Sequence, residues 1–382
     1  MARHLRIALL VDPLSVLVRG GLHAAELGRE LLARGHEVGI FGAPARLLSE
    51  GMPLRADSEP RPAGGARVLG FRPDAVLAYD ALSPAAWLGS RIARRRRVPL
   101  ILVEAGAFAG GSWLQRSLWR LGESLWGAYV RRTAGLLVAL DPVAREHALR
   151  EGFSPSRMKT LPQGVDLQRF RPGIASRVLV EHKIRGRILL FTGSLEARAG
   201  LELLIAAFAR TVGQRGDWSL VLAGDDHAPP RLRACAERLG VGARVHCLNV
   251  EEEDLPGLYA SSTLVAAPAL EDGAGALEIA RAMACGRPVL ASDLPRLRYL
   301  VEPEETGLVA PPGDLAAWVA ILQRAASAPE ARRRWGERAR RAAEERFAWS
   351  RVAEAFEEAV ARAHSHGAPC ADPTGARARA RV

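Results

Sequence analysis

The chain has 382 residues, of which 48% are hydrophobic and 5% aromatic, and its formal net charge is +11. This length and composition suffice for two hydrophobic cores, so two domains are expected rather than one. No apolar run approaches the roughly 18 residues that a membrane span needs, and the four cysteines lack the spacing of a zinc site or a disulfide frame. These features predict a cytoplasmic protein without a cysteine-bound metal.

The positive charge is concentrated in the N-terminal half. Residues 1–170 carry 24 Lys and Arg against 15 Asp and Glu, whereas residues 171–382 carry 29 against 27. A basic half can face nucleic acid, anionic lipid or a phosphorylated substrate. Because no motif that reads RNA or DNA accompanies the charge, nucleic acid is the least favoured of these partners.

The N-terminal half alternates predicted strands with predicted helices. Residues 6–12 form a short apolar run typical of a strand, residues 24–32 carry apolar side chains at helical spacing, and residues 38–41 begin another strand. Further apolar runs predict strands at residues 75–78, 100–103 and 136–139. This alternation is typical of a parallel sheet with helices on both faces.

The same alternation restarts after residues 163–166, and residues 170–173 have the composition of a linker. Strands are predicted at residues 187–192, 219–223, 244–248, 264–267 and 288–291. The predicted fold class is therefore α/β, with two doubly wound Rossmann-like domains at residues 1–170 and 171–348. Residues 367–382 are small, dotted with arginine and without periodicity, and are expected to form a disordered tail.

Four loops with glycine follow predicted strands in these two domains. In doubly wound sheets, ligands bind beyond the carboxyl ends of the strands. The loops that meet this condition are Gly20–Gly21, Gly193–Ser194, Gly224–Asp225 and Glu271–Gly275. The sequence therefore predicts ligand contacts in these four segments.

Six segments occur along the chain in a characteristic order. They are G-G-L-H-A-A-E-L-G-R-E-L-L-A-R-G-H-E-V, L-P-Q-G-V-D-L-Q-R-F, F-T-G-S-L-E-A-R-A-G-L-E-L-L-I-A-A-F, L-V-L-A-G-D-D, A-M-A-C-G-R-P-V-L-A-S-D and T-G-L-V-A-P-P-G-D. Their order and spacing resemble the retaining GT-B glycosyltransferases, a family that includes bacterial mannosyl-, glucosyl- and N-acetylhexosaminyltransferases. The resemblance extends over residues 5–362.

The resemblance implies a GT-B fold, in which two Rossmann-like domains face each other across a cleft and segment 349–366 returns to the first domain. It implies transfer of a hexose from a nucleoside diphosphate sugar to a saccharide or lipid-linked acceptor, with retention of the anomeric configuration. Cell-surface polysaccharide or glycolipid synthesis is the expected setting. No metal and no other cofactor are expected, because the family uses protein cations and helix dipoles at the diphosphate.

Gly20 and Gly21 match glycines of the family whose backbone N–H groups approach the donor phosphates. Glycine suits this contact because no Cβ blocks a close approach. An ordinary strand-to-helix turn that needs positive φ is an alternative explanation for the same two residues. The sequence leaves both explanations open.

The second domain of the family opens with G-R-L-x-x-x-K-G, whose arginine and lysine neutralise the diphosphate leaving group. Here the segment runs from Gly193 to Gly200, with Ser194 in place of the arginine and Ala199 in place of the lysine. The match puts Gly193 and Ser194 at the donor. Arg198, one position before the missing lysine, is a candidate for the phosphate contact. A solvated charge at a helix start is the alternative.

Two glutamates eight positions apart contact the donor sugar and the ribose in the family. Glu271 is the candidate for the first, which contacts sugar hydroxyls and the developing charge at the anomeric carbon. The register fixed by residues 282–286 puts Arg281 at the second position. Glu278, three residues before Arg281, lies on the same helical face and is the candidate for the ribose contact.

Alternatives remain for this stretch as well. Glu278 can instead pair with Arg281 or favour the helix N-terminus. Gly273 and Gly275 form the turn before this helix. Both are counted with Glu278 and Arg281 among the donor-binding candidates.

In many relatives a histidine at a strand end of the first domain is directed toward the reacting sugar. Ala105 occupies that position here, and Glu104 beside it is a candidate for acceptor binding and catalysis. The expected polar residue is therefore replaced at positions 105, 194, 199 and 281. A catalytically inactive GT-B protein that serves as a binding or scaffold subunit is the alternative to a transferase.

Residues 113–129 carry leucines on one helical stripe with three tryptophans beside it. Such a helix, near Arg94–Arg97, would lie on an anionic membrane at the inner face of the plasma membrane and bring a lipid-linked acceptor to the cleft. A helix packed into the core with bulky tryptophans is the alternative.

Overall fold

The computed structural model describes residues 4–12, 20–42, 55–57, 64–104, 126–224, 229–273 and 275–365. The chain divides into two compact units: residues 1–162 with 349–382, and residues 163–348. This division differs from the expected boundary after residue 170. Val165 donates its N–H to the carbonyl of Phe347 at 2.7 Å, and the ring of Phe170 packs at 5.9 Å from that of Tyr259. The segment before residue 171 therefore belongs to the second unit.

The first unit is built on a seven-stranded parallel sheet in the order β3-β2-β1-β4-β5-β6-β7. Its strands are β1 (Arg6–Leu10), β2 (Glu37–Phe41), β3 (Arg55–Asp57), β4 (Ala75–Tyr79), β5 (Leu100–Glu104), β6 (Leu136–Ala139) and β7 (Met158–Thr160). The central strands are buried on both faces, which explains their continuous apolar runs.

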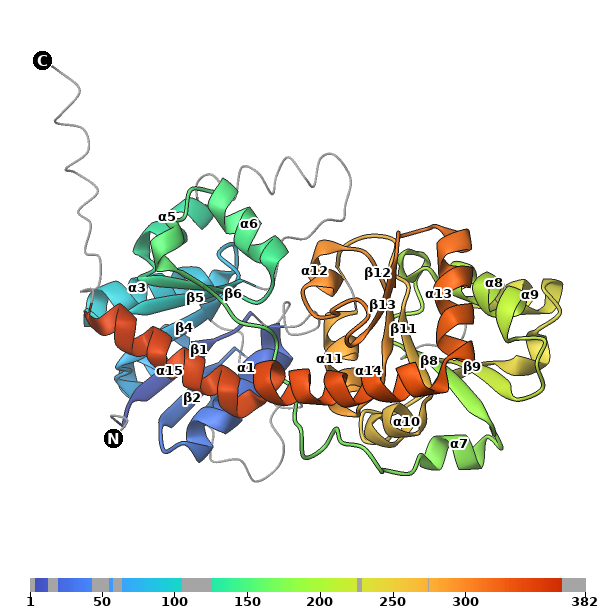
Figure 1. Ribbon diagram of the computed structural model, residues 1–382. Coiled ribbons are helices and arrows are strands. Elements are labelled where there is room, and N and C mark those ends of the chain that lie inside the picture. The colour runs from blue at the N-terminus through green and yellow to red at the C-terminus, as the bar shows by residue number, and fades with distance from the viewer. Residues whose placement is uncertain are drawn as a thin grey trace, which may run out of the picture. The chain divides into compact units, whose positions relative to one another are not determined.

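Helices cover both faces of this sheet (Figure 1). Alternate residues of β1 point to opposite faces: Leu9 packs in the core with α1 (Gly20–Ala33) and α15 (Trp349–Ser365). Leu10 packs in the opposite core, beneath the helices α2 (Gly64–Phe71), α3 (Pro84–Arg96), α5 (Ala128–Thr133) and α6 (Pro142–Arg150). The C-terminal helix α15 is thus part of the first unit, and Glu357 on it pairs with Arg34 at 2.7 Å.

His23 of α1 is fully buried in this core. Its Nδ1 lies 2.9 Å from the hydroxyl of Tyr79, and its ring packs edge-on against Trp349 of α15 at 5.1 Å. Burial lowers the pKa of His23 from its ordinary value of 6.5 to about 3. The imidazole is therefore neutral in the folded protein throughout the physiological range.

We expect His23 to contribute less to the stability of the first unit as the pH falls. The unfolded chain protonates His23 near pH 6.5 and the folded chain only near pH 3, so the contribution of His23 to stability falls as the pH drops below 6.5 and keeps falling toward 3. Between pH 7 and 5 we expect the part of the free energy of unfolding that depends on His23 to fall by about 2 kcal/mol. Glu104, whose pKa in the folded protein is raised to about 7, changes the total in the opposite direction, so the effect of His23 is the difference between the wild type and a variant without this histidine. Urea unfolding followed by circular dichroism at the two pH values measures it.

The His23→Gln variant, which cannot titrate, serves as the comparison. It should be less stable than the wild type at pH 7, because glutamine does not fill the same space, yet it should lack the histidine part of the acid dependence. His182→Gln, at an exposed position, should keep the full wild-type dependence. Equal acid dependence in the wild type and His23→Gln would contradict the prediction.

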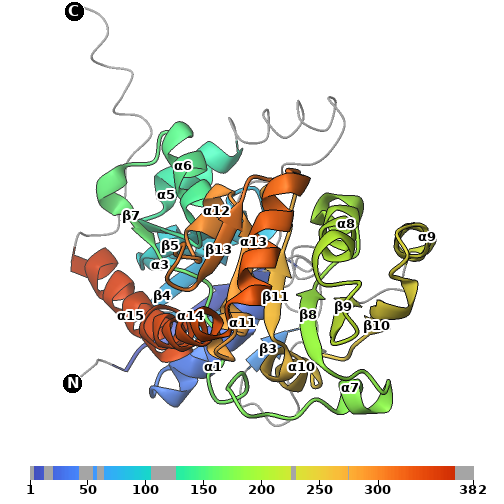
Figure 2. The same cartoon turned by 45° about the vertical axis from the view of Figure 1, so that its right-hand side comes forward.

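The second unit is built on a six-stranded parallel sheet in the order β10-β9-β8-β11-β12-β13, with β10 and β13 at its two edges (Figure 2). Its strands are β8 (Arg187–Thr192), β9 (Trp218–Gly224), β10 (Val245–Asn249), β11 (Leu264–Ala267), β12 (Val289–Ser292) and β13 (Gly307–Ala310). Both sheets have the doubly wound arrangement predicted from the alternation of apolar runs, and the predicted fold class is confirmed.

The helices of the second unit form two layers around separate cores. One core holds Trp218 and Trp318 under α8 (Leu201–Thr211), α9 (Pro230–Arg238) and α13 (Leu315–Ser327). The other holds Tyr259 and Ile279 with α7 (Arg177–Glu181), α10 (Leu255–Ser261), α11 (Ala276–Ala284) and α12 (Pro295–Arg298). Helix α14 (Pro329–Ala342) contributes to both, through Trp335 and Ala339. No helix within the described ranges is long and apolar enough to cross a membrane.

Candidate functional site

The sheet of the second unit has a switch point between β8 and β11. These strands are neighbours although β9 and β10 come between them in the sequence. The chain leaves β8 toward one side of the sheet, and β11 begins the other side. Doubly wound sheets bind ligands beyond the carboxyl ends of the strands at such a point. The predicted loops Gly193–Ser194 and Glu271–Gly275 follow these two strands.

Gly193 begins the loop after β8 with a φ of 123°, a conformation that favours glycine. Its N–H donates to the carbonyl of Ala223 in β9 at 3.0 Å. Gly224 comes so close that a Cβ there would lie 2.8 Å from the carbonyl oxygen of Gly193. The carboxyl ends of β8 and β9 are therefore held together by two glycines, and Ser194 beside them is exposed.

Glu278 lies in the first turn of α11, which begins after Gly275 with a φ of 95°. A Cβ added to Gly193 would lie 3.4 Å from Oε1 of Glu278. The carboxylate thus faces the backbone at the end of β8, and the positive end of the helix dipole favours its charge. The structure brings together Gly193, Gly275 and Glu278, three of the residues predicted to bind a donor.

The loops after β8 and β11 are joined at Gly200. This residue has a φ of 72°, and a Cβ on it would lie 2.0 Å from the carbonyl oxygen of Pro268. Next to it, Leu270 donates its N–H to the carbonyl of Arg198 at 2.9 Å. Only glycine satisfies both the conformation and the close approach, so Gly200 fixes how the two loops meet.

Glu271 is exposed on the loop after β11. Its neighbour Asp272 accepts the backbone N–H of Arg296 at 3.3 Å, which ties the loop to α12. Gly273 has a φ of 150° with open space around the position of a Cβ. The structure leaves the predicted sugar contact of Glu271 and the predicted donor contact of Gly273 as predictions.

Arg198 is held in an ion pair within its own loop. Its Nε lies 2.8 Å from Oε2 of Glu196, and both side chains are more than half exposed. The short 3-10 helix η5 (Ala197–Ala199) places this pair just before α8. A phosphate contact by Arg198 therefore requires the guanidinium to leave Glu196 or to bind with its remaining N–H groups.

Arg281 lies in a network of its own on the inner side of α11. Its side chain is only 10% exposed and forms an ion pair with Glu252 after β10. The guanidinium lies 4.9 Å from the ring centroid of Phe170. Both Arg281 and Glu278 influence the titration of Tyr259, whose pKa is raised by burial. Arg281 and Glu278 form no ion pair in the described part of the chain. Arg281 pairs with Glu252 and not, as in the alternative explanation, with Glu278.

Two partners in this region have no sequence signal that marks them. Glu252 lies in the acidic run E-E-E-D, which is typical of a solvated loop, and only the fold brings it to Arg281. Thr192, the last residue of β8, shares a hydrogen bond between its hydroxyl and that of Tyr259. The first contact ties α11 to the segment after β10, and the second ties α10 to the end of β8.

Two groups of the residues predicted from the sequence lie in the first unit: the glycine pair Gly20 and Gly21, and Glu104. Gly20 and Gly21 open α1, as expected for glycines at a helix start after β1. Their predicted phosphate contact stays a prediction, because residues 13–19 before them lie outside the described ranges.

Glu104 ends β5 as a buried carboxylate, 7% exposed. It accepts the backbone N–H of Ala81 at 3.3 Å and lies 3.8 Å from the guanidinium of Arg131. Burial and the charge of Asp80 raise the pKa of Glu104 to about 7, against the lowering effect of Arg131. A role in acceptor binding stays a prediction, and Ala105 lies outside the described residues.

The two halves of the chain match two family profiles. Residues 20–169 match the family described as Glycosyltransferase Family 4, and residues 180–342 match Glycosyl transferases group 1. The chain belongs to the GT-B glycosyltransferase family. The resemblance of the six ordered segments is therefore confirmed at the level of the GT-B glycosyltransferase family, and family membership supports a transferase activity.

Individual relatives of this GT-B glycosyltransferase are distant. D-inositol 3-phosphate glycosyltransferase of Saccharomonospora viridis is 29% identical over 301 residues, which are 73% of this chain and 69% of that protein. The glycosyltransferase of Rickettsia africae has a TM-score of 0.77 at 15% identity over 96% of this chain and all of its own. HepE of Anabaena in complex with UDP-glucose has a TM-score of 0.75 at 20% identity, over 94% of this chain and 100% of its own. The solved structures share the fold.

Proposed function

We propose that this protein transfers a hexose from a nucleoside diphosphate sugar to a saccharide or lipid-linked acceptor, with retention of the anomeric configuration. Cell-surface polysaccharide or glycolipid synthesis is the proposed setting. One observation supports the proposed donor site above all others: Glu278 lies close to Gly193. A Cβ added to Gly193 would be 3.4 Å from the Glu278 carboxylate. A carboxylate that can accept hydrogen bonds from hydroxyl groups therefore lies beside the main chain of a glycine, at the switch point of the second unit.

Each part of this site suits one part of the proposed donor. The carboxylate of Glu278 can accept both ribose hydroxyls, and the glycine backbone at Gly193 admits a ligand without obstruction by a side chain. The N-terminus of α11 favours negative charge nearby. Glu271 is proposed to contact the hexose, and Arg198 or the exposed hydroxyl of Ser194 to contact the phosphates.

The relatives suggest which donors to test first. HepE was solved with UDP-glucose, and the protein of Saccharomonospora viridis is named for transfer to D-inositol 3-phosphate. We therefore propose UDP sugars as the first donors to test, and phosphorylated or lipid-linked polyols and saccharides as acceptors.

Contact with an anionic membrane is proposed for an exposed patch of the first unit. Trp87 on α3 and Trp126 are 36% and 40% exposed, and their rings lie 5.7 Å apart. The guanidinium of Arg91 lies 4.8 Å from the ring of Trp87, and Arg94 and Arg95 of the same helix are exposed. Exposed indoles beside arginines suit the headgroup region of an anionic bilayer. Most of the predicted helix at 113–129 lies outside the described residues.

Sedimentation with lipid vesicles tests this contact. The full chain should bind vesicles that contain anionic lipid more tightly than purely zwitterionic ones, and a Trp87→Ser/Trp126→Ser variant should lose most of the difference. Equal binding of the variant and the wild type would remove the patch from the proposal.

The alternative is a non-catalytic GT-B protein that binds or scaffolds. Arg281 favours it, because the position that carries the ribose glutamate in the family is occupied by an arginine that pairs with Glu252. Calorimetric titration of the full chain with nucleoside diphosphates and their sugars decides between the two. Micromolar binding of one nucleotide, followed by turnover with an acceptor panel, supports the transferase. Absence of binding by every nucleotide would overturn it.

A further inference from the structure

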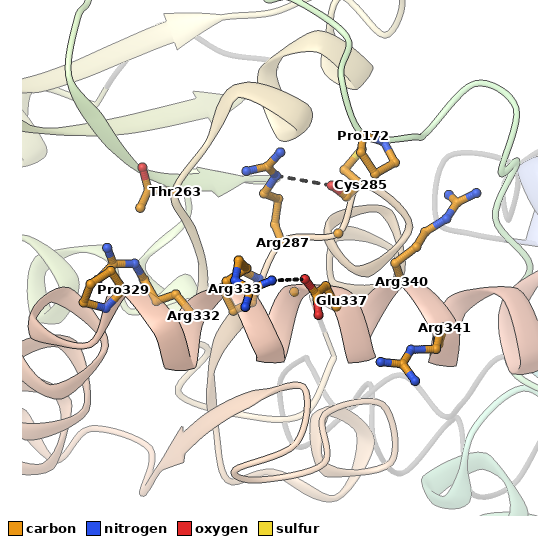
Figure 3. Close-up of a pocket in the computed structure, with 13 residues that line it drawn as sticks. Pro172, Thr263, Cys285, Arg287, Pro329, Arg332, Arg333, Glu337, Arg340 and Arg341 are labelled. Carbon is orange, nitrogen blue, oxygen red and sulfur yellow. Dashed lines mark hydrogen bonds and ion pairs between the residues drawn. The ribbon is translucent and has the colours of Figure 1, made fainter.

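A cavity of about 680 Å³ lies in the second unit between α14 and the turn that follows α11 (Figure 3). Five arginines line it, from Arg287 in the turn and from positions 332, 333, 340 and 341 of α14. The only acidic side chain among its lining residues is Glu337. The candidate donor site is at the other end of α11, which is nine residues or about 13 Å long. The cavity is therefore a separate feature.

The walls of this cavity are fixed by close backbone contact. Gly286 takes a φ of 68° in the turn after α11. A Cβ on Gly336 of α14 would lie 2.3 Å from the carbonyl oxygen of Gly286. Because helix and turn touch without side chains between them, they cannot approach further. The cavity is preformed, as small-molecule sites usually are.

Few carboxylates pair with the arginines that line the cavity. Arg333 pairs with Glu337 at 2.9 Å, and Arg340 pairs with Glu344 at 2.6 Å. Among the described residues, no carboxylate lies within ion-pair distance of the remaining three arginines, at positions 287, 332 and 341. Burial lowers the pKa of Arg287 and of Arg332, where Arg187 adds to the effect. An anion between these side chains would supply the missing charge.

Arg332 and Arg340 each donate to two main-chain carbonyls through one nitrogen, and their other N–H groups include donors without a main-chain partner. Arg287 donates to the carbonyls of Cys285 at 3.2 Å and Ser262 at 3.1 Å, and these bonds orient its guanidinium. A guanidinium carries five N–H donors in a planar fork that matches the oxygens of a phosphoryl group. Arg341, which also lines the cavity, is exposed. The cavity therefore offers oriented donors at its wall and an additional, exposed cation.

We propose that this cavity binds a compact polyanion, a small molecule with two phosphoryl groups such as a diphosphate or a sugar bisphosphate. Two groups suit it because arginines approach from two elements, the turn after α11 and the helix α14. A volume of about 680 Å³ is typical of a small-molecule site. None of the lining residues is aromatic, so the stacking surface that single-stranded nucleic acids use is absent from it. The proposal does not rest on the proposed transferase function.

Calorimetry on the full chain tests the proposal with inorganic phosphate, pyrophosphate and a hexose bisphosphate as probes. Pyrophosphate or the bisphosphate should bind, more tightly than phosphate, and the affinity should fall as salt is added. The Arg333→Gln/Arg341→Gln variant should weaken this binding about tenfold. Both positions are exposed on α14, so the fold should be retained, which a thermal unfolding scan verifies.

The matched control is Arg334→Gln/Arg338→Gln on the same helix. It removes the same charge, and neither residue lines the cavity. It breaks the ion pair between Arg338 and Glu305, whereas the test variant breaks the pairs of Arg333 with Glu330 and Glu337. The affinity of the control should stay within about twofold of the wild type. Because Arg333 and Arg341 line the cavity and are not part of the candidate donor site, weaker binding in the test variant alone assigns the binding to this cavity. Equal weakening in both variants, or no binding of any probe, would overturn the proposal.

Discussion

A Glu278→Ala variant is expected to bind nucleoside diphosphates about a hundredfold more weakly than the wild type. Hydrogen bonds to a charged group contribute about 1.5–3 kcal/mol, and the carboxylate of Glu278 is placed to accept ribose hydroxyls next to Gly193. A loss of about 2.7 kcal/mol corresponds to a hundredfold change in affinity. Calorimetric titration of variant and wild type with the best nucleotide from the panel measures it.

Two companion variants separate charge from position. Glu278→Gln keeps one acceptor at the same place and should weaken binding about tenfold. Glu271→Ala, on the exposed loop after β11, should leave the affinity for the nucleoside diphosphate unchanged and weaken only that for the nucleotide sugar. Wild-type nucleotide affinity in Glu278→Ala would exclude the ribose contact.

A Gly200→Ala variant is expected to destabilise the second unit by about 3 kcal/mol or more. The added Cβ would lie 2.0 Å from the carbonyl oxygen of Pro268, a backbone atom that cannot rotate away, and the φ of 72° disfavours alanine as well. The clash would push apart the loops after β8 and β11, so nucleotide binding should weaken too. Urea unfolding measures the change in stability.

Gly240→Ala provides the matched control for Gly200→Ala. Gly240 lies in the same unit with a φ of 70°, but the nearest atom to its added Cβ is 3.9 Å away. It should therefore show only the conformational cost of a left-handed residue, about 1 kcal/mol. If the two variants were equally destabilised, the close approach to Pro268 would have no energetic role.

Hydrophobic pattern predicted the interior of both sheets but not all of their edges. Buried strands such as β8 and β11 have unbroken apolar runs, and their predicted bounds, 187–192 and 264–267, are those of the structure. Three edge strands were not predicted: β3 with the sequence R-A-D, β7 with M-K-T, and β13 with G-L-V-A. An edge strand pairs on one side only and tolerates polar residues, so the periodicity of β3 and β7 gives too little signal; β13 is apolar but has only four residues.

The candidate site shows a similar limit. The proximity of Gly193, Gly275 and Glu278 follows from where their loops leave the sheet, which the sequence reveals. The sequence does not reveal the partner of Arg281, because Glu252 lies 29 positions away and two elements of secondary structure separate the two residues along the chain. Likewise, the raised pKa of Glu104 depends on burial and on charges from other segments. Local pattern predicts loop positions, whereas ion pairs depend on the finished packing.

The return of α15 to the first unit has a consequence for synthesis of the chain. Residues 163–348 form a complete unit, whereas the core over α1 needs Trp349, Val352 and Phe356 from the far end of the sequence. As the chain leaves the ribosome from its N-terminus, the second unit can close its core while the first still exposes apolar surface. The unit that is translated first is therefore completed last.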